Sequence, residues 1–264
     1  MSMHKLQWIY VVFFLIASAF KQDVPPRLQL FLLIGQSNMA GRGVPEASDQ
    51  SADPRIWMFD KALNWVAARD PMHFDKPAMV GVGPGLAFAK RLADTYPNLA
   101  IGLIPCAVGG SGIDVWKPGA YYEPTKSYPY DDALRRAKTA LENGQLAGFI
   151  WHQGESDSTP EKADVYEEKL IELVQRFRTD LNAPNVPFVV GTLGDFVVKR
   201  NPAAKTVNEA LQRATQRTSK AYYVLSAGLT DKGDSTHFDT PSARTLGQRY
   251  ADVFIQEKLL TARQ

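Results

Sequence analysis

The sequence contains very little cysteine. Among its 264 residues, Cys106 is the only one. One cysteine cannot form a disulfide within the chain, so even an exported form of the protein must depend on its core for stability. Cys106 lies in an apolar segment with no basic residue beside it, which favours a packed core position over a reactive thiolate.

An excess of charge of one sign is also missing. The chain has 30 Lys and Arg against 28 Asp and Glu, which gives a formal net charge of +2. Because the basic residues are scattered among acidic ones, no nucleic-acid partner is expected, and a neutral or small substrate is favoured over a polyanion. The 45% hydrophobic and 22% charged content is typical of a globular protein with one substantial core.

The sequence has no apolar run of the length that usually spans a membrane. Residues 6–20 form an apolar run of roughly 15 residues, whereas ~20 are needed to cross a bilayer. Lys5 precedes this run, and the small residues at 17–19 fit a cleavage site. We therefore expect residues 1–19 to be the signal peptide of a secreted or periplasmic protein, with an uncleaved membrane anchor as the alternative. No other membrane partner is expected, and residues 27–264 should form a single domain.

What the sequence does have is an apolar segment that ends in an abrupt polar turn. Residues 28–34 are nearly all apolar and contain neither Pro nor Gly, which is typical of a strand covered on both faces. Gly35 permits a sharp bend, and Ser37 follows at the carboxyl end of the strand, where ligands bind in open α/β sheets. Ser37 is therefore a candidate nucleophile, and a helix cap is its alternative role.

Strand and helix patterns alternate along the rest of the chain. This alternation predicts an α/β fold, a three-layer α/β/α sandwich with a mostly parallel five-stranded sheet. Further strands are expected at residues 55–59, 99–108, 146–151 and 186–193, with a short strand-like run at 222–226. The last helix is expected to begin at Pro241.

Polar clusters follow several of these expected strands. Ser37, the pair Gly109-Gly110 and Gln153 each come at the carboxyl end of a strand, and His237 lies in a loop before the last helix. Because parallel strands end at the same edge of a sheet, we expect these residues to converge.

Such a cluster contains the groups needed for nucleophilic catalysis. A serine hydroxyl needs a base, and a histidine oriented by a carboxylate supplies one. His237 is the best candidate among the four histidines, since Asp234 stands three residues before it. Asp239 and Asp195 are the fallback partners for its ring.

Acyl transfer also needs hydrogen-bond donors for a negative oxygen in the transition state. Three donors are available: the backbone N–H of Ser37, the backbone N–H of Gly109 or Gly110, and the side-chain amide of Gln153. An ordinary turn residue bonded to backbone is the alternative role for Gln153.

Five blocks of the sequence carry a resemblance to a known family. Together they resemble the signature blocks of the SGNH hydrolases, in the sialate O-acetylesterase-like and acetyl xylan esterase branch known as carbohydrate esterase family six. The blocks are residues 35–41, 83–85, 105–111, 151–157 and 234–238. The resemblance extends from about Arg27 to the carboxyl terminus.

The resemblance implies a flavodoxin-like fold and an esterase that removes acetyl groups from carbohydrate without a metal or other cofactor. By motif position, Ser37 is the nucleophile, His237 the base and Asp234 its partner, with a glycine of the Gly109-Gly110 pair in the oxyanion hole. Gln153 stands where the wider superfamily usually has an Asn.

Some roles are left open by the sequence. Asn38 and Glu155 are candidates for supporting the site, and Glu155 either supports the histidine or buttresses the turn. The acetylated substrate, of the acetyl xylan or O-acetyl sialic acid type, depends on loop shapes that the sequence does not reveal.

Two other functions compete with the esterase. A glycosidase would use Glu155 and Asp157 as paired carboxylates, but their separation of two residues on one loop argues against opposite placement across a sugar ring. A non-catalytic carbohydrate-binding protein would stack sugars on Trp57, Trp116 and Trp151, and the complete Ser, His and Asp set argues against binding alone.

Overall fold

The computed structural model describes residues 25 and 27–260, so the expected signal peptide at 1–19 lies outside the described residues. One seven-stranded sheet forms the centre, in the order β3-β2-β4-β1-β5-β6-β7. The strands are β1 (Leu28–Gly35), β2 (Ile56–Phe59), β3 (Trp65–Ala67), β4 (Ile101–Pro105), β5 (Gly144–His152), β6 (Phe188–Gly191) and β7 (Ala221–Val224). The helices are α1 (Ser37–Ala40), α2 (Pro84–Thr95), α3 (Pro129–Ala140), α4 (Pro160–Ala163), α5 (Tyr166–Asp180), α6 (Asp195–Arg200), α7 (Ala203–Arg217) and α8 (Thr240–Gln256).

The expected α/β class and mostly parallel sheet are confirmed, and the expected number of five strands is wrong. All neighbouring strands pair in parallel except β2 and β3, which are antiparallel. The three-residue β3 was missed because it is too short for a periodic pattern. The second additional strand is β7, which overlaps the short strand-like run expected at 222–226.

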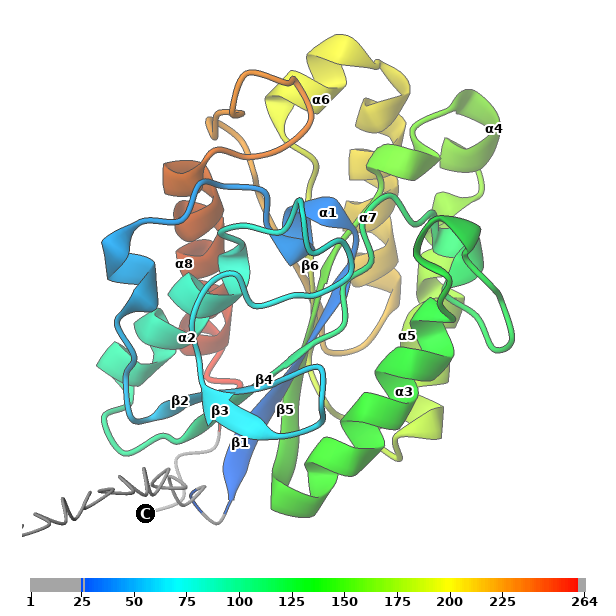
Figure 1. The fold of residues 1–264 in the computed structure, drawn as a ribbon. Coiled ribbons are helices and arrows are strands. Elements are labelled where there is room, and N and C mark those ends of the chain that lie inside the picture. The colour runs from blue at the N-terminus through cyan, green and yellow to red at the C-terminus, as the bar shows by residue number, and fades with distance from the viewer. Residues whose placement is uncertain (1–24, 26, 261–264) are drawn as a thin grey trace, which may run out of the picture.

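The order of the parallel strands determines where a ligand can bind. Leaving out the β2–β3 extension, the strands run β4-β1-β5-β6-β7, which is the flavodoxin-like order 2-1-3-4-5. The strand order reverses between β1 and β5. In such sheets ligands bind next to this reversal, at the carboxyl ends of the strands. Figure 1 shows β1 running through the middle of the molecule to α1, which begins with Ser37.

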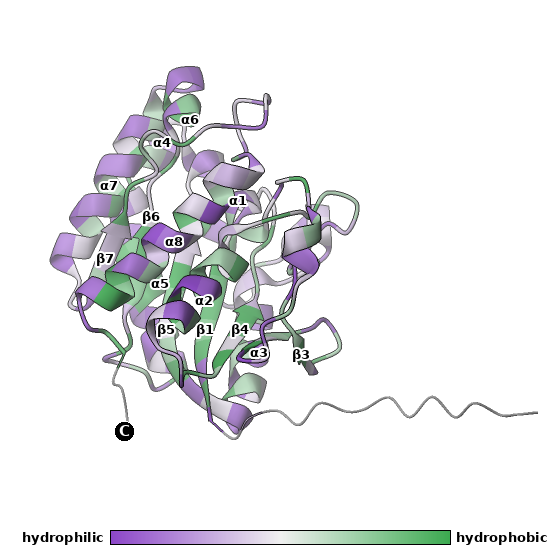
Figure 2. Cartoon of the chain, turned by 90° about the vertical axis from the view of Figure 1, so that its left-hand side faces the viewer, coloured by the Kyte–Doolittle hydropathy of each residue, from purple (hydrophilic) through white to green (hydrophobic). Residues whose placement is uncertain are grey.

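The β1 strand is buried on both faces, as its composition predicts. Phe31 and Leu33 on one face and Leu30 and Leu32 on the other are all fully buried. Helices α2 and α8 pack together on one side of the sheet, and α3 and α5 lie on the other, with α7 against α5. Figure 2 shows hydrophobic strands inside and hydrophilic outer surfaces on the helices, so the sheet is the centre of the core.

No helix among residues 25 and 27–260 has the length and apolar content that a membrane crossing requires.

The close contact between α2 and α8 depends on Gly247. A Cβ added at this residue would lie 2.2 Å from Pro84 O and 2.9 Å from Phe88 N, both backbone atoms of α2. Since backbone cannot move aside as a flexible side chain does, any side chain at this position must separate the two helices.

We therefore predict that Gly247→Ala destabilises the protein although alanine favours helix. Overpacking of this kind typically costs about 1–3 kcal/mol of the free energy of unfolding. Urea denaturation of the variant measures this loss. Gln248→Ala, at the adjacent exposed position of α8, is the control and should leave the unfolding midpoint nearly unchanged. Equal midpoints for both variants would contradict the close-packing argument.

Candidate active site

The turn after β1 places Ser37 against the end of β5. Gly35 has φ of +127°, and a Cβ there would lie 2.1 Å from His152 O, so both the conformation and the space require glycine. The next residue, Gln36, donates from its backbone N–H to His152 O at 2.9 Å. The polar turn is therefore fixed by the register of the two central strands, and Ser37 begins α1 at the carboxyl edge of the sheet.

Ser37, His237 and Asp234 form a continuous chain of hydrogen bonds. Ser37 Oγ lies 3.0 Å from His237 Nε2, and His237 Nδ1 lies 2.7 Å from Asp234 Oδ2. Because the carboxylate accepts the Nδ1 proton, the neutral ring has a lone pair on Nε2, which faces the serine hydroxyl. This is the arrangement in which a histidine can take a proton from serine.

The fallback carboxylates lie elsewhere. Asp239 caps α8 by accepting from Ser242 N at 2.8 Å, and Asp195 accepts from Gly228 N at 3.0 Å. Of the three candidate carboxylates, Asp234 is the one that bonds the His237 ring.

The loop that carries Asp234 and His237 is held mainly by local contacts. Asp231 Oδ1 accepts from Gly233 N and Ser235 N, each at 2.8 Å. Asp234 Oδ1 accepts from His237 N, also at 2.8 Å, so one carboxylate bonds both the backbone and the ring of the histidine. The pair is thereby preorganised within a single turn of chain.

The two backbone donors expected at the glycine pair have different surroundings. Gly109 N donates to Asp75 Oδ2 at 2.6 Å, and the same oxygen forms a buried ion pair with Arg42 at 3.1 Å. In the part of the chain that the structure describes, no acceptor is found for Gly110 N–H or Ser37 N–H. These last two donors are therefore available to a bound oxygen.

Gln153 is fully buried, and its amide is engaged at both ends. Its Nε2 lies 3.0 Å from Gln36 Oε1, 3.1 Å from Ser111 O and 2.5 Å from Asp157 Oδ2. Its Oε1 accepts from the Tyr166 hydroxyl at 2.7 Å. In this geometry the amide joins three loops behind the site, and its hydrogens point to protein acceptors instead of to open space.

Asn38 and Glu155, the expected supporting residues, are hydrogen-bonded to each other. Asn38 also bonds the backbone on both sides of His237, through Thr236 O at 3.0 Å and Phe238 N at 3.1 Å. The structure therefore brings together Ser37, its neighbour and the loop of the histidine.

The residues of the two competing functions do not form usable sites. Trp57, Trp116 and Trp151 are 3%, 1% and 0% exposed, so they belong to the core and offer no face to a sugar. Asp157 is buried, and its carboxylate accepts hydrogen bonds from Gln153 Nε2 and Ile113 N, which hold the turn after β5 in place. The burial of these residues adds a structural argument to those that the sequence already gave against the stacking and paired-carboxylate alternatives.

Two residues near the site were missed by sequence reasoning. Asp75 and Arg42 lie in irregular segments without a periodic pattern, and Asp75 meets Gly109 from a position 34 residues away in sequence. No local signal in the sequence connects them to the glycine pair.

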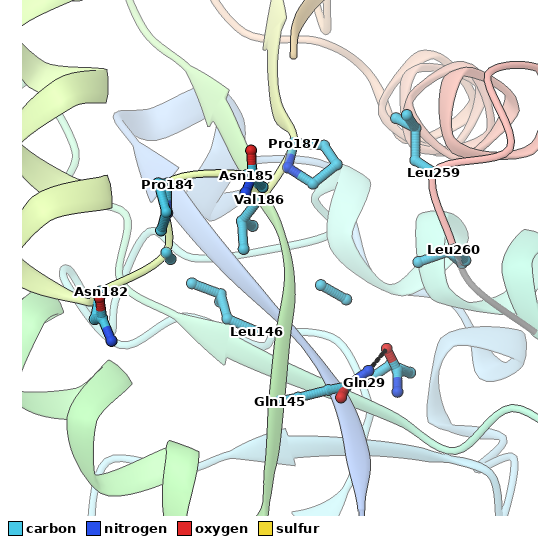
Figure 3. A pocket seen from close by; sticks show the side chains of 12 residues that line it. Gln29, Gln145, Leu146, Asn182, Pro184, Asn185, Val186, Pro187, Leu259 and Leu260 are labelled. Carbon is cyan, nitrogen blue, oxygen red and sulfur yellow. Dashed lines mark hydrogen bonds between the residues drawn. The ribbon is translucent and has the colours of Figure 1, made fainter. Parts of the chain in front are cut away.

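A cavity of about 320 Å³ lies at the amino ends of β1 and β5, at the opposite end of these strands from Ser37 (Figure 3). Gln29 and Gln145 project into this region, and the other lining residues are amides, prolines and aliphatic side chains. It has no titratable or nucleophilic lining residue, so it offers no group for the chemistry described above.

A second cavity, of about 410 Å³, adjoins the segment that leads to the glycine pair. It is lined by residues 105–108, His73, Asp75 and Arg136, among others. His73 is buried there, and its Nδ1 accepts from Ala107 N at 3.2 Å. Among the described residues, no group of three or more His, Cys, Asp or Glu side chains is arranged to hold a metal ion.

Residues 27–256 match the family described as carbohydrate esterase, sialic acid-specific acetylesterase. The chain belongs to this family. A probable carbohydrate esterase of Arabidopsis thaliana is 30% identical over 261 residues, covering 89% of this chain and 93% of that protein. The X-ray structure of the same Arabidopsis thaliana protein has a TM-score of 0.78 at 29% identity, covering 88% of this chain and 99% of that one. The expected family and enzyme class, a carbohydrate O-acetylesterase, are thereby confirmed.

Two more distant solved structures share the fold. The crystal structure of NanS has a TM-score of 0.69 at 19% identity, covering 89% of this chain and 99% of that chain. A carbohydrate acetylesterase from Xanthomonas citri has a TM-score of 0.61 at 20% identity, covering 86% of this chain and 55% of that chain.

The surroundings of His237 predict the acid limb of the pH profile of this carbohydrate esterase. Burial lowers the pKa of His237 below its ordinary value of 6.5, and Asp234 opposes that shift. A histidine base works when neutral, so kcat/KM should hold its plateau as the pH falls through 6.5 and should decline only at lower pH.

Hydrolysis of an acetyl ester between about pH 4 and 8 measures this profile. Asp234→Asn removes the carboxylate that raises the His237 pKa, so in that variant the midpoint should move further down and kcat should fall by roughly 10⁴. A wild-type midpoint above 6.5 would contradict the effect of burial.

Proposed function

We propose that this chain releases acetate from O-acetylated carbohydrate by a Ser-His-Asp acyl-enzyme mechanism. The observation that carries the proposal is the hydrogen-bond chain from Ser37 Oγ through the His237 ring to Asp234, with distances of 3.0 and 2.7 Å. Family membership supports the substrate class, since the family consists of carbohydrate esterases.

The geometry supports a two-step reaction. In the first step, Ser37 Oγ attacks the acetyl carbonyl carbon while its proton passes to His237 Nε2. The ester C–O bond then breaks, the sugar oxygen takes the proton from His237, and an acetyl-serine remains. In the second step a water molecule gives a proton to His237 and attacks the acetyl group, and acetate leaves as Ser37 regains its proton.

We assign the oxyanion hole to the backbone N–H groups of Ser37 and Gly110. The support is that neither has a protein acceptor within the described residues. Gly109 and Gln153 were also expected to donate, but their hydrogens already bond Asp75, Gln36, Ser111 and Asp157. Gln153 would act as a donor only by leaving these acceptors, so we assign it to holding the turn.

The substrate is proposed to be an acetylated sugar of the sialic acid or xylan type. The family description names sialic acid, and the relatives are carbohydrate esterases. Comparison of acetate release from O-acetylated sialic acid and from acetylated xylan distinguishes the two. Export of the chain is a further proposal, based on the apolar run and cleavage pattern within residues 1–20.

Replacement of the nucleophile tests the proposed mechanism. Ser37→Ala should lower kcat for acetate release by roughly three orders of magnitude or more, because no hydroxyl remains to form the acetyl-enzyme. Thermal melting checks that the variant is folded. Ser219→Ala, at an exposed position after α7, is the control and should keep full activity. A folded Ser37→Ala variant with near-normal turnover would refute the assignment.

The role of Gln153 has a separate test. Gln153→Ala removes the amide donor of the Ser111 carbonyl, and a buried acceptor left without a partner typically costs about 1–3 kcal/mol. We expect both the melting temperature and kcat to fall. A loss of ~10²–10³ in kcat with an unchanged melting temperature would instead identify Gln153 as a direct oxyanion donor.

A further inference from the structure

Asn38 holds the backbone on both sides of the proposed catalytic histidine. Its Nδ2 donates to Thr236 O at 3.0 Å, and its Oδ1 accepts from Phe238 N at 3.1 Å. These are the residues directly before and after His237. Since Ser37 bonds the ring of the same histidine, two consecutive residues fix both its backbone and its side chain.

The contacts determine which end of the Asn38 amide faces which neighbour. Phe238 N–H is a donor and must meet the amide oxygen, so the two Nδ2 hydrogens go to Thr236 O and to Oε1 of Glu155. A flipped amide would set its nitrogen against Phe238 N–H and its oxygen against two other oxygens. Glu155 is thus the second acceptor that selects one orientation of Asn38.

Glu155 lies in a buried environment between several elements. It begins the short turn Glu155–Asp157 after β5, and its side chain is 3% exposed. The titratable and charged groups that face it are Asp157 in the same turn, Arg200 of α6, His152 of β5, Tyr166 of α5 and Tyr250 of α8. Burial raises the pKa of Glu155 to about 7, so a large share of the carboxyl is protonated at neutral pH.

The tautomer of His152 determines what Glu155 meets on its other side. The Tyr250 hydroxyl donates its one hydrogen to Trp151 O at 2.8 Å, so His152 Nδ1, 3.1 Å from that hydroxyl, must be a donor. His152 Nε2 therefore has a lone pair, and it lies 3.9 Å from Glu155 Oε1. Within the described residues, His152 Nε2 and Glu155 Oε2 are both buried without a hydrogen-bond partner.

We propose that Glu155 positions His237 through Asn38, and that it does so as an uncharged acid whose proton is directed toward His152. At 3.9 Å the two atoms are too far apart for a hydrogen bond, so a carboxylate would set a buried negative charge against the ring lone pair with no donor between them. A carboxylic acid is uncharged and has a hydrogen that can face the ring nitrogen. Glu155 bonds neither Ser37 nor His237 among the described residues, so it is a positioning residue. The inference rests on the mechanism proposed above.

Replacement of Glu155 by two different residues tests the proposal. In Glu155→Gln the amide oxygen can take the place of Oε1 and accept from Asn38, and the side chain stays uncharged, so this variant should keep kcat within about threefold of wild type. Glu155→Ala removes one of the two acceptors that hold the Asn38 amide nitrogen, which loosens the position of the His237 loop. Because misplacement of a catalytic group can cost ~10²-fold, we expect a kcat loss of about 10- to 100-fold with KM little changed. Glu161→Gln, at an exposed position of α4, is the matched control and should not change activity.

A double-mutant cycle tests the route through Asn38. Asn38→Ala should lower kcat about as much as Glu155→Ala, and the two changes together should be no worse than the more damaging one. Full additivity of the two losses, or normal kcat in Asn38→Ala, would overturn the route. If Glu155→Gln is as slow as Glu155→Ala, the uncharged form is overturned. If Glu155→Ala does not fold, Glu155→Gln and Asn38→Ala still decide the question, and Ser37→Ala reports separately on the underlying mechanism.

Discussion

The contact between the end of β1 and the end of β5 is the constraint on which the rest of the site depends. Gly35 lies directly against the His152 carbonyl, and the next amide donates to that same oxygen. Because the two strands run in parallel, the residues that follow them emerge side by side. One backbone register therefore sets the turn that contains Ser37 beside the turn that begins with Gln153, and neither could shift without the other.

The loop with Asp234 and His237 follows a different principle. Its own carboxylates and amides fold it, since Asp231 and Asp234 accept most of the hydrogen bonds within it. Hydrogen bonds within the loop fix its own conformation, but they do not fix its position relative to Ser37. Asn38, from the turn that contains Ser37, supplies two contacts that hold the loop against the sheet. Phe238 adds to them by packing against His152 and Phe196. The site thus combines an internally ordered loop with contacts that set its position.

Sequence reasoning succeeded where the signal is local. The abrupt change of polarity after residue 34 located Ser37, and a spacing of three residues located Asp234 beside His237, where their side chains now meet. It could not reach features that depend on distant partners. The hydrogen bonds of the Gln153 amide to Gln36 and Ser111, and the burial of the three tryptophans, involve segments far away in the sequence. The parallel sheet was predictable from alternation, whereas the short edge strand β3 was not.

The two ends of β1 lie on opposite sides of the molecule. Arg27 precedes the amino end of the strand, and Ser37 follows its carboxyl end, roughly 26 Å away for eight strand residues. Anything joined to the chain before Arg27, whether an anchor or a fused partner, is attached on the side away from the proposed catalytic groups. An attachment at this point therefore does not have to cover the carboxyl ends of the strands, where Ser37 lies.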